Sequence, residues 1–501
     1  MLDVQNGSAA EPAVPRAGSG SSGPAGENGE NSPAGVPAGA GSAAPAAPVL
    51  PYALLAGVFG LLYFLYSWVQ YERFRSPSWD LGIFEQAVRA YAELRAPIVD
   101  IKGPGFLILG DHFSPVTALL APLYWVWSSP LALLFAQAAL FAASAAVVGR
   151  TAQQVLGSRA LGIALTVAYG LSWGLQEAVK SDFHEIAFAV PLLALTCRAL
   201  LLGRWTAAVA WALPLVLVKE DMGLTVAMVG AVLFVKGQKR LGAAVAGFGV
   251  AAFALTVLVL IPAASRVGQY DYWAKIEKGG DGAEVSFLDS VLGAFQHGEK
   301  WEMVLFVLGV AGFLCLRSPL TLLILPTLAW RFLSHDANHW GLFWHYNAIL
   351  MPVVFLALVD AVRAVRSSPR PWLAAYGRVA IPVVTAIAAV HALDMPLREL
   401  TRPATYTVDA RTLDARRAVA AVPAGTSVET NVTLMAHLTA DHTVYWVGGA
   451  PGVSPDYLAL DLSSGWSQPV ADPVGLAAQL HPEARYEVAV QAGQFVVLKR
   501  Q

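Results

Sequence analysis

The chain has 501 residues, of which 56% are hydrophobic and only 14% charged, and its mean hydropathy is +0.53. An average soluble protein is about 25% charged, so this composition excludes an ordinary soluble protein, whose single core could not bury so much apolar surface. The formal net charge of −2 provides no basic field that would favour nucleic acid as a partner. We therefore expect the lipid bilayer to be the main partner.

Residues 1–48 consist almost entirely of Gly, Ala, Pro and Ser with scattered acids, a composition that predicts a disordered tail. The first apolar run, 51–69, follows no basic segment and ends without a small-residue cleavage site, so it predicts a first membrane span and not a signal peptide. Cys197 and Cys315 lie in apolar stretches far apart in the sequence, which indicates buried thiols and argues against a disulfide framework.

Further apolar runs follow the first, and most are near the roughly 20 residues that cross a bilayer. They are 114–127, 130–149, 160–175, 186–202, 205–218, 222–235, 241–262, 302–316, 319–333, 346–362 and 373–391. Short connections rich in Lys and Arg are held in the cytoplasm, and five such connections alternate with polar loops. These basic connections are 150–159, 198–204, 236–240, Arg317 and 363–378.

This charge pattern predicts a cytoplasmic N-terminus and places 71–113, 176–185, 219–221, 263–300, 335–345 and everything after His391 outside. Only one crossing can then separate 71–113 from Arg150. We interpret 114–127, which is short and contains Pro115 and Pro122, as a half-buried juxtamembrane helix. Eleven crossings remain.

The C-terminal segment 396–501 returns to a soluble composition. A helix is predicted over 409–422, and short β-like runs are predicted at 427–429, 443–447, 457–462, 486–490 and 495–498. The predicted fold is an all-α polytopic membrane protein of about eleven helices over 49–395, followed by a small extramembrane α/β domain over 396–501.

Ionisable residues beside spans cost several kcal/mol unless they face water or a partner, so their clusters are the best functional signal in this chain. Four clusters fall on the predicted external side. Their candidate residues are Asp80, Glu85, Lys102, Asp111 and His112; Lys180, Asp182, His184 and Glu185; Lys219, Glu220 and Asp221; and His339 and His345.

Each cluster has a plainer alternative. Asp80 would act only as the N-cap of a helix over 81–94, the second cluster would be a solvated loop, and the third would be a hairpin turn. The histidine spacing of the fourth matches no standard zinc pattern, so hydrogen bonds and phosphate contacts are favoured there. Carboxylates and cations together at a lipid boundary suit a lipid-linked phosphosugar, with Mg²⁺ or Mn²⁺ as a possible cofactor.

Several stretches resemble a known family: DLGIFEQA at 80–87, GDHFSP at 110–115, APLY at 121–124, FHE at 183–185 and VKED at 218–221. They are similar to bacterial predicted membrane proteins with the domain of unknown function 2079, over about residues 52–390 and into the C-terminal part. That family is more distantly similar to the C-superfamily glycosyltransferases, which use polyprenyl-phosphate sugars.

The resemblance implies that Asp80 is the catalytic base or a metal-associated carboxylate, and that Asp182 or Glu185 is a second acidic residue. The related enzymes often have adjacent acids in the first loop, whereas Leu81 follows Asp80 here. The sequence therefore leaves open whether Glu85 shares the catalytic work and whether the reaction uses a metal.

We expect an inverting glycosyltransferase of the inner or plasma membrane that moves a sugar from a polyprenyl-phosphate donor to an envelope acceptor at the outer leaflet. The expected catalytic residues are Asp80, Glu85, Asp182 and Glu185; the expected metal ligands are Asp80 and Asp182; and the expected substrate-binding residues are Lys102, Asp111, His112, Lys180, His184, Lys219, Glu220, Asp221, His339 and His345. The alternatives are a transporter or lipid flippase, which predicts internal repeats that we do not find convincingly, and a non-catalytic envelope scaffold.

Overall fold

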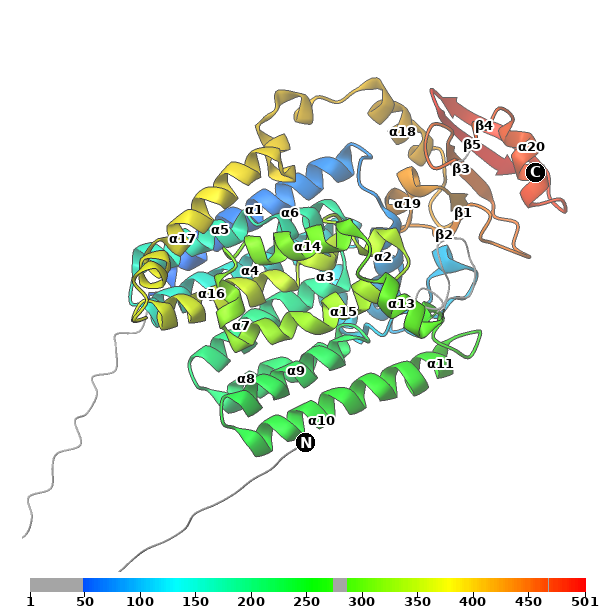
Figure 1. The fold of residues 1–501 in the computed structure, drawn as a ribbon. Coiled ribbons are helices and arrows are strands. Elements are labelled where there is room, and N and C mark those ends of the chain that lie inside the picture. Colours follow the sequence, from blue (N-terminus) through cyan, green and yellow to red (C-terminus); the bar gives the residue numbers. More distant parts are fainter. Residues whose placement is uncertain (1–47, 274–285, 467) are drawn as a thin grey trace, which may run out of the picture. The chain divides into compact units, whose positions relative to one another are not determined.

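The computed structural model describes residues 48–273, 286–466 and 468–501 (Figure 1), which belong to one unit. Apart from its last residue, the tail predicted at 1–48 lies outside the described residues. The described part is mostly helical, and a small sheet follows the helices near the C-terminus.

Five helices are long and apolar enough to cross a bilayer, which needs about 20 residues at 1.5 Å per residue. Two of them are single elements, α1 (Leu50–Glu72) and α4 (Pro130–Leu156). The other three are composite: α10 (Lys239–Leu255) continues through a π-helical turn into α11 (Ile261–Ala264), a short turn at His345 leads into α16 (Leu350–Val365), and α17 (Pro371–His391) extends to Asp394.

The remaining predicted spans are helical but shorter, so the structure does not confirm a count of eleven crossings. They are α5 (Arg159–Gly170), α7 (Ala189–Leu201), α8 (Trp205–Ala212), α9 (Met222–Val235), α14 (Gly298–Gly309) and α15 (Leu325–Leu333). A further short helix, α6 (Trp173–Lys180), extends into the segment 176–185 that was predicted as a loop. Prolines account for part of this shortness, since 3₁₀ turns beginning near Pro214 and Pro319 interrupt two of the runs.

The run at 114–127 forms a 3₁₀ turn, Pro115–Leu120, followed by α3 (Ala121–Val126). Each piece carries its proline in its first turn, where the missing N–H costs nothing. Twelve residues at 1.5 Å per residue reach only about 18 Å, well short of the ~30 Å hydrocarbon core. This length fits the half-buried juxtamembrane helix that the charge pattern favoured, and that interpretation stays a prediction.

The helical part packs around α16, which is buried along almost its whole length (Figure 1). Helix α4 packs on α1, α5 and α7, while α9 and α10 form a separate tight antiparallel pair. Glycines allow this pair to approach closely: a Cβ at Gly230 would lie 2.4 Å from the Ala246 nitrogen, and one at Gly249 would lie 2.4 Å from the Ala227 nitrogen. Small residues at helix contacts are typical of packing in membranes.

The C-terminal domain contains a five-stranded sheet in the order β2-β1-β3-β5-β4, formed by β1 (Ser427–Thr430), β2 (Thr443–Trp446), β3 (Tyr457–Asp461), β4 (Tyr486–Ala492) and β5 (Phe495–Arg500). Strands β1, β2 and β3 are parallel, whereas β5 runs antiparallel to both β3 and β4. The three helices of the domain are α18 (Ala410–Ala420), α19 (Val432–Leu438) and α20 (Pro473–Leu480). The predicted helix and all five predicted strands are confirmed.

The C-terminal domain shares a hydrophobic core with α2 (Trp79–Ala92), the helix that follows the first span. Gly82 permits the contact, because a Cβ there would lie 3.1 Å from Cγ of Met435 on α19. Arg89 donates to the carbonyl oxygens of Ala440 and His442, just beyond the C-terminus of α19, where a cation is favoured by the helix dipole. The position of α2 is therefore set partly by the C-terminal domain.

His437 fixes the same contact from the other side. Its ring is stacked between Phe74 and Tyr71, with centroid separations of 3.8 and 4.0 Å. Burial lowers the pKa of His437 to about 3, so the imidazole is neutral at physiological pH.

We predict that this contact makes the protein acid-sensitive. Because the folded-state pKa of His437 lies below the ordinary value of 6.5, the unfolded state takes up its proton first as the pH falls. The stability that neutral His437 contributes is complete above about pH 6.5 and is lost towards pH 3, at roughly 1.4 kcal/mol per pH unit. The thermal unfolding midpoint of full-length protein, followed against pH, should fall more steeply than that of His437→Phe. Parallel curves for the two proteins would contradict the prediction.

Candidate functional site

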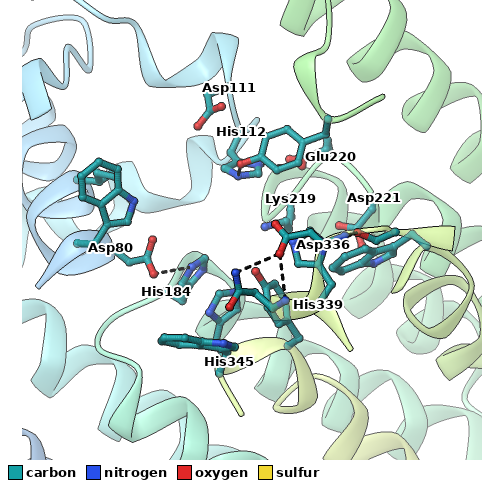
Figure 2. Close-up of a pocket in the computed structure, with 18 of the residues that line it drawn as sticks. Asp80, Asp111, His112, His184, Lys219, Glu220, Asp221, Asp336, His339 and His345 are labelled. Carbon is teal, nitrogen blue, oxygen red and sulfur yellow. Dashed lines mark hydrogen bonds and ion pairs between the residues drawn. The ribbon is translucent and has the colours of Figure 1, made fainter. Parts of the chain in front are cut away.

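A cavity of about 590 Å³, called here the central cavity, lies between the loops that carry the four polar clusters (Figure 2). This volume falls within the range of small-molecule sites. The structure brings together at its walls most of the residues predicted from the sequence: Asp80, Lys102, Asp111, His112, His184, Lys219, Glu220, Asp221, His339 and His345.

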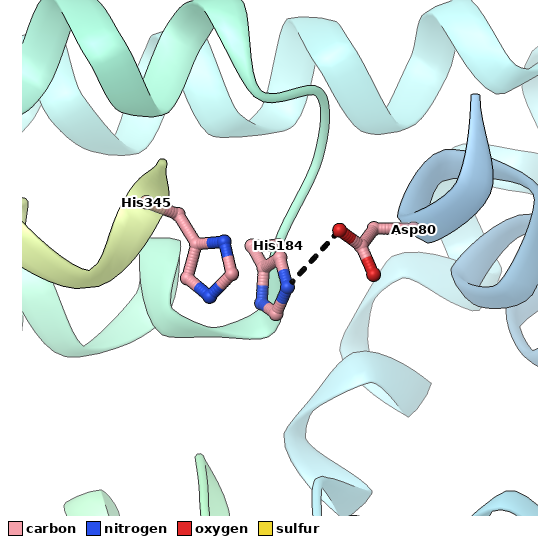
Figure 3. A group of neighbouring side chains, drawn as sticks. All are labelled: Asp80, His184 and His345. Carbon is pink, nitrogen blue, oxygen red and sulfur yellow. Dashed lines mark ion pairs between the residues drawn. The ribbon is translucent and has the colours of Figure 1, made fainter. Parts of the chain in front are cut away.

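Asp80 and His184 meet on one side of this cavity (Figure 3). Asp80 lies in the first turn of α2 with its side chain 33% exposed, and one of its carboxylate oxygens is 3.5 Å from Nε2 of His184. The backbone before each residue is strained, since Ser78 and Asp182 have φ of 62° and 68°. Such non-glycine conformations cost of order 1–3 kcal/mol and concentrate at functional sites.

Behind His184, two more charges continue inward from the cavity. Nδ1 of His184 forms an ion pair with Glu185, which is completely buried, and the other carboxylate oxygen of Glu185 accepts from Lys219 Nζ at 3.0 Å. Burial alone would lower the pKa of His184, but Glu185 and Asp80 raise this pKa to about 9. Burial would likewise raise the pKa of Glu185, yet His184 and Lys219 hold it well below its usual value. His184, Glu185 and Lys219 are therefore all ionised at neutral pH.

Asp182 lies beside these residues but does not border the central cavity. Its carboxylate accepts hydrogen bonds from the Ser76 hydroxyl and the Ser78 backbone N–H, which ties the loop before α2 to the second cluster. Burial raises the pKa of Asp182 to about 7, although these hydrogen bonds oppose the shift. Its predicted catalytic and metal-binding roles stay predictions, and its contacts indicate that it positions the loop that carries Asp80.

On the opposite wall, Glu220 is surrounded by donors. It pairs with Nδ1 of His112 at 2.9 Å and accepts from the Tyr270 hydroxyl at 3.1 Å, while the Tyr272 hydroxyl contacts Nε2 of His112 at 2.6 Å. This arrangement joins the first and third clusters, as Lys219 joins the second and third. The nearby Lys102 and Asp111 form an ion pair at the same cavity.

The fourth cluster is organised by Arg331, a residue that the sequence reasoning did not single out. Its buried guanidinium donates to the His339 and Gly341 carbonyl oxygens and to the Asn347 side chain. The loop that ends at His345 is therefore folded around a cation. The sequence did contain a signal for this role, because Arg331 is a charged residue within the apolar run 319–333.

Glu85 and Lys180 lie away from the cavity walls. Glu85 is completely buried, and its carboxylate accepts a hydrogen bond from the Tyr124 hydroxyl of α3. Lys180 is half-exposed and pairs with Glu177 at 3.4 Å. Glu185 is likewise absent from the walls, and His184 and Lys219 connect it to them. The roles predicted for Glu85, Lys180 and Glu185 stay predictions.

Some wall residues were not identified as site residues from the sequence. Tyr270 and Tyr272 belong to the loop after α11, Trp330 lies in an apolar run, and Val432 comes from the C-terminal domain. The paired tyrosines in a polar loop predicted to be external were a usable signal in the sequence, whereas no local pattern marked Val432.

Comparisons with known proteins agree with this architecture. The sequence model of a family described as "Predicted membrane protein (DUF2079)" matches residues 70–497. Two crystal structures of ArnT from Cupriavidus metallidurans have similar folds: one, bound to undecaprenyl phosphate, has a TM-score of 0.52 at 12% identity, and the apo form has 0.50 at 13%. Each comparison covers 89% of this chain and 97% of the other. No curated protein matches the sequence.

We predict that the Lys219–Glu185 pair is energetically coupled. Removing one partner of a buried pair leaves an uncompensated charge, so Lys219→Met and Glu185→Gln should each lower the free energy of unfolding by about 3–5 kcal/mol. The double variant should lose less than the sum of the two, by roughly 1–3 kcal/mol. Denaturant titrations of purified protein in detergent provide the measurement.

The control is Lys180→Met, since that half-exposed lysine should contribute less than about 1 kcal/mol. Strict additivity of the Lys219 and Glu185 variants would rule out the coupling.

Proposed function

Since the chain belongs to the DUF2079 family of predicted membrane proteins and folds like ArnT, we propose that it is a multi-pass membrane glycosyltransferase that takes a sugar from a polyprenyl-phosphate donor. The resemblance to polyprenyl-phosphate-dependent glycosyltransferases of the C superfamily, expected from the sequence, is confirmed at the level of fold. The identity of the sugar donor, the side of the membrane that holds the acceptor, and the catalytic residues are all part of this proposal.

The observation that carries the proposal is the position of Asp80. Its carboxylate is partly open, lies 3.5 Å from Nε2 of His184, and shares the central cavity with cations. A partly desolvated carboxylate beside an imidazolium can accept a proton from an acceptor hydroxyl. That hydroxyl oxygen then forms the new bond to the anomeric carbon, the bond from this carbon to the donor phosphate breaks, and the configuration inverts.

The leaving lipid phosphate gains negative charge in this step, so cations near it lower the barrier. Lys219 and Lys102 border the cavity, and each ammonium has three donors, of which its carboxylate partner uses one. Leu224 of α9 and Phe253 of α10 add apolar surface to the same cavity, on the helix pair that carries the glycine contacts. Apolar walls next to cations suit the first units of a polyprenyl chain attached to phosphate.

The charge pattern of the loops supports the orientation that we propose, with a cytoplasmic N-terminus and the cavity and C-terminal domain on the outer side of the inner or plasma membrane. The acceptor would then be an envelope component at the outer leaflet.

We predict that Asp80→Asn lowers transfer by about 10²–10⁴-fold, because the amide cannot accept the acceptor proton. Full-length protein in vesicles is given a radiolabelled polyprenyl-phosphate sugar together with an envelope extract, and labelled product is counted. Binding of the lipid donor should change little, since Asp80 does not carry the positive charge that holds phosphate.

The matched control is Glu93→Gln, which removes an exposed carboxylate at the end of the same helix and should leave transfer unchanged. Full transfer by Asp80→Asn would reject the assignment. Movement of labelled lipid across the vesicle membrane without any bond cleavage would instead support the rival function, a lipid flippase.

A further inference from the structure

His345 is the least explained polar residue at the central cavity. It is 5% exposed, and among the described residues neither of its ring nitrogens has a hydrogen-bond partner. An unsatisfied buried polar side chain is rare, because each such group costs about 1–3 kcal/mol. The missing partner is therefore expected to be a ligand of the folded protein.

The ring of His345 lies against His184, with centroids 3.3 Å apart and planes inclined by 24° (Figure 3). One ligand atom from each of Asp80, His184 and His345 lies within 4.8 Å of the other two. Tetrahedral ligands that lie about 2.0–2.1 Å from a metal ion are roughly 3.4 Å apart, which is close to the 3.5 Å between Asp80 and Nε2 of His184. The Asp80–His184 separation therefore suits one ion, and a ring nitrogen of His345 lies within 4.8 Å of both atoms.

His184 becomes a metal ligand when an ion displaces the proton on Nε2, because metal ions bind neutral imidazole and release protons on binding. A metal-binding histidine usually directs its second nitrogen to a carboxylate, which fixes the ring and its tautomer. Here Nδ1 of His184 faces Glu185, and Lys219 in turn holds Glu185 at 3.0 Å. Nε2 is then directed to Asp80 and the cavity.

We propose that Asp80, His184 and His345 bind one divalent transition-metal ion at the central cavity. Two imidazoles and one carboxylate favour Zn²⁺ or Mn²⁺ over Mg²⁺, which prefers oxygen ligands alone. Three protein ligands leave a coordination position open towards the cavity, where an anionic oxygen could bind. This set differs from the Asp80 and Asp182 pair predicted from the sequence, because the Asp182 carboxylate is directed to Ser76 and Ser78.

The inference does not rest on glycosyl transfer, since it concerns binding of an ion to the substrate-free protein. Asp80 has two carboxylate oxygens, so it can bind an ion through one while the other faces the cavity. Metal binding and sugar transfer can therefore succeed or fail separately in experiments.

The test measures the metal content of full-length protein purified in detergent. The protein is stripped with a chelator, dialysed against Zn²⁺, Mn²⁺ or Mg²⁺ alone, and analysed by mass spectrometry of the elements. Wild type should retain about one Zn²⁺ or Mn²⁺ per chain and only background Mg²⁺. His345→Gln should bind at least about tenfold more weakly, and His345→Asp, which restores a ligand atom, should recover part of the affinity.

Co²⁺ provides a second readout, because its visible absorption reports the ligands directly: the band of the wild type should be lost in His345→Gln. The matched control is His112→Gln, which alters another histidine of the same cavity whose ring nitrogens contact Glu220 and Tyr272. It should keep its metal.

Wild type with only background Zn²⁺ and Mn²⁺ would overturn the proposal, as would a His345→Gln protein that binds like wild type. If His345→Gln fails to fold, His345→Asp and the Co²⁺ spectrum of wild type still decide the outcome. Loss of metal binding together with intact transfer in the vesicle assay would leave the proposed function standing and remove the metal from it.

Discussion

The site depends on a line of alternating charges that the surrounding helices withdraw from water. Lys219, Glu185, His184 and Asp80 follow one another from the interior to the cavity, and only Asp80 is substantially exposed. Each buried charge is tolerable only because its neighbours have the opposite sign. These residues come from α2 and from two separate loops. The ion pairs hold the three segments at fixed positions, since moving one of them would leave a charge unpaired in a medium of low polarity.

This constraint explains why the site combines rigidity with strained backbone. Ser78, Asp182 and Trp344 have positive φ, and each lies one or two residues before a side chain of the Asp80, His184 and His345 group. The strain is sustained by contacts elsewhere, notably the hydrogen bonds that Asp182 accepts and the buried guanidinium of Arg331 beneath the fourth cluster. A cavity built in this way holds its charged groups at fixed positions before any ligand binds.

Much of this arrangement could be predicted from the sequence, because costly polar residues in an apolar chain have few places to go. Asp80, His184, Lys219 and His345 are far apart in sequence, yet alternation of basic loops was enough to put them on one side of the bilayer. The five strands were predictable because alternation and turn residues are local signals.

The remainder could not be predicted, because it depends on three-dimensional packing. The stacking of His345 on His184 and the contribution of Val432 to the cavity involve residues that are distant in sequence and have no local pattern. Span lengths were overestimated for the same reason: hydropathy identifies apolar runs, but proline-initiated 3₁₀ turns shorten the helices within them.

The core shared by α2 and the C-terminal domain has a consequence for biogenesis. Arg89 and its partner Thr439 are 350 residues apart, so at about 5–20 residues per second the ribosome needs on the order of 20–70 s to supply the second after the first. Throughout that interval α2, the helix that carries Asp80, lacks its neighbour. In a nascent or truncated chain the core around α2 is therefore incomplete, and it is finished only when the last-made part of the polypeptide folds against the first.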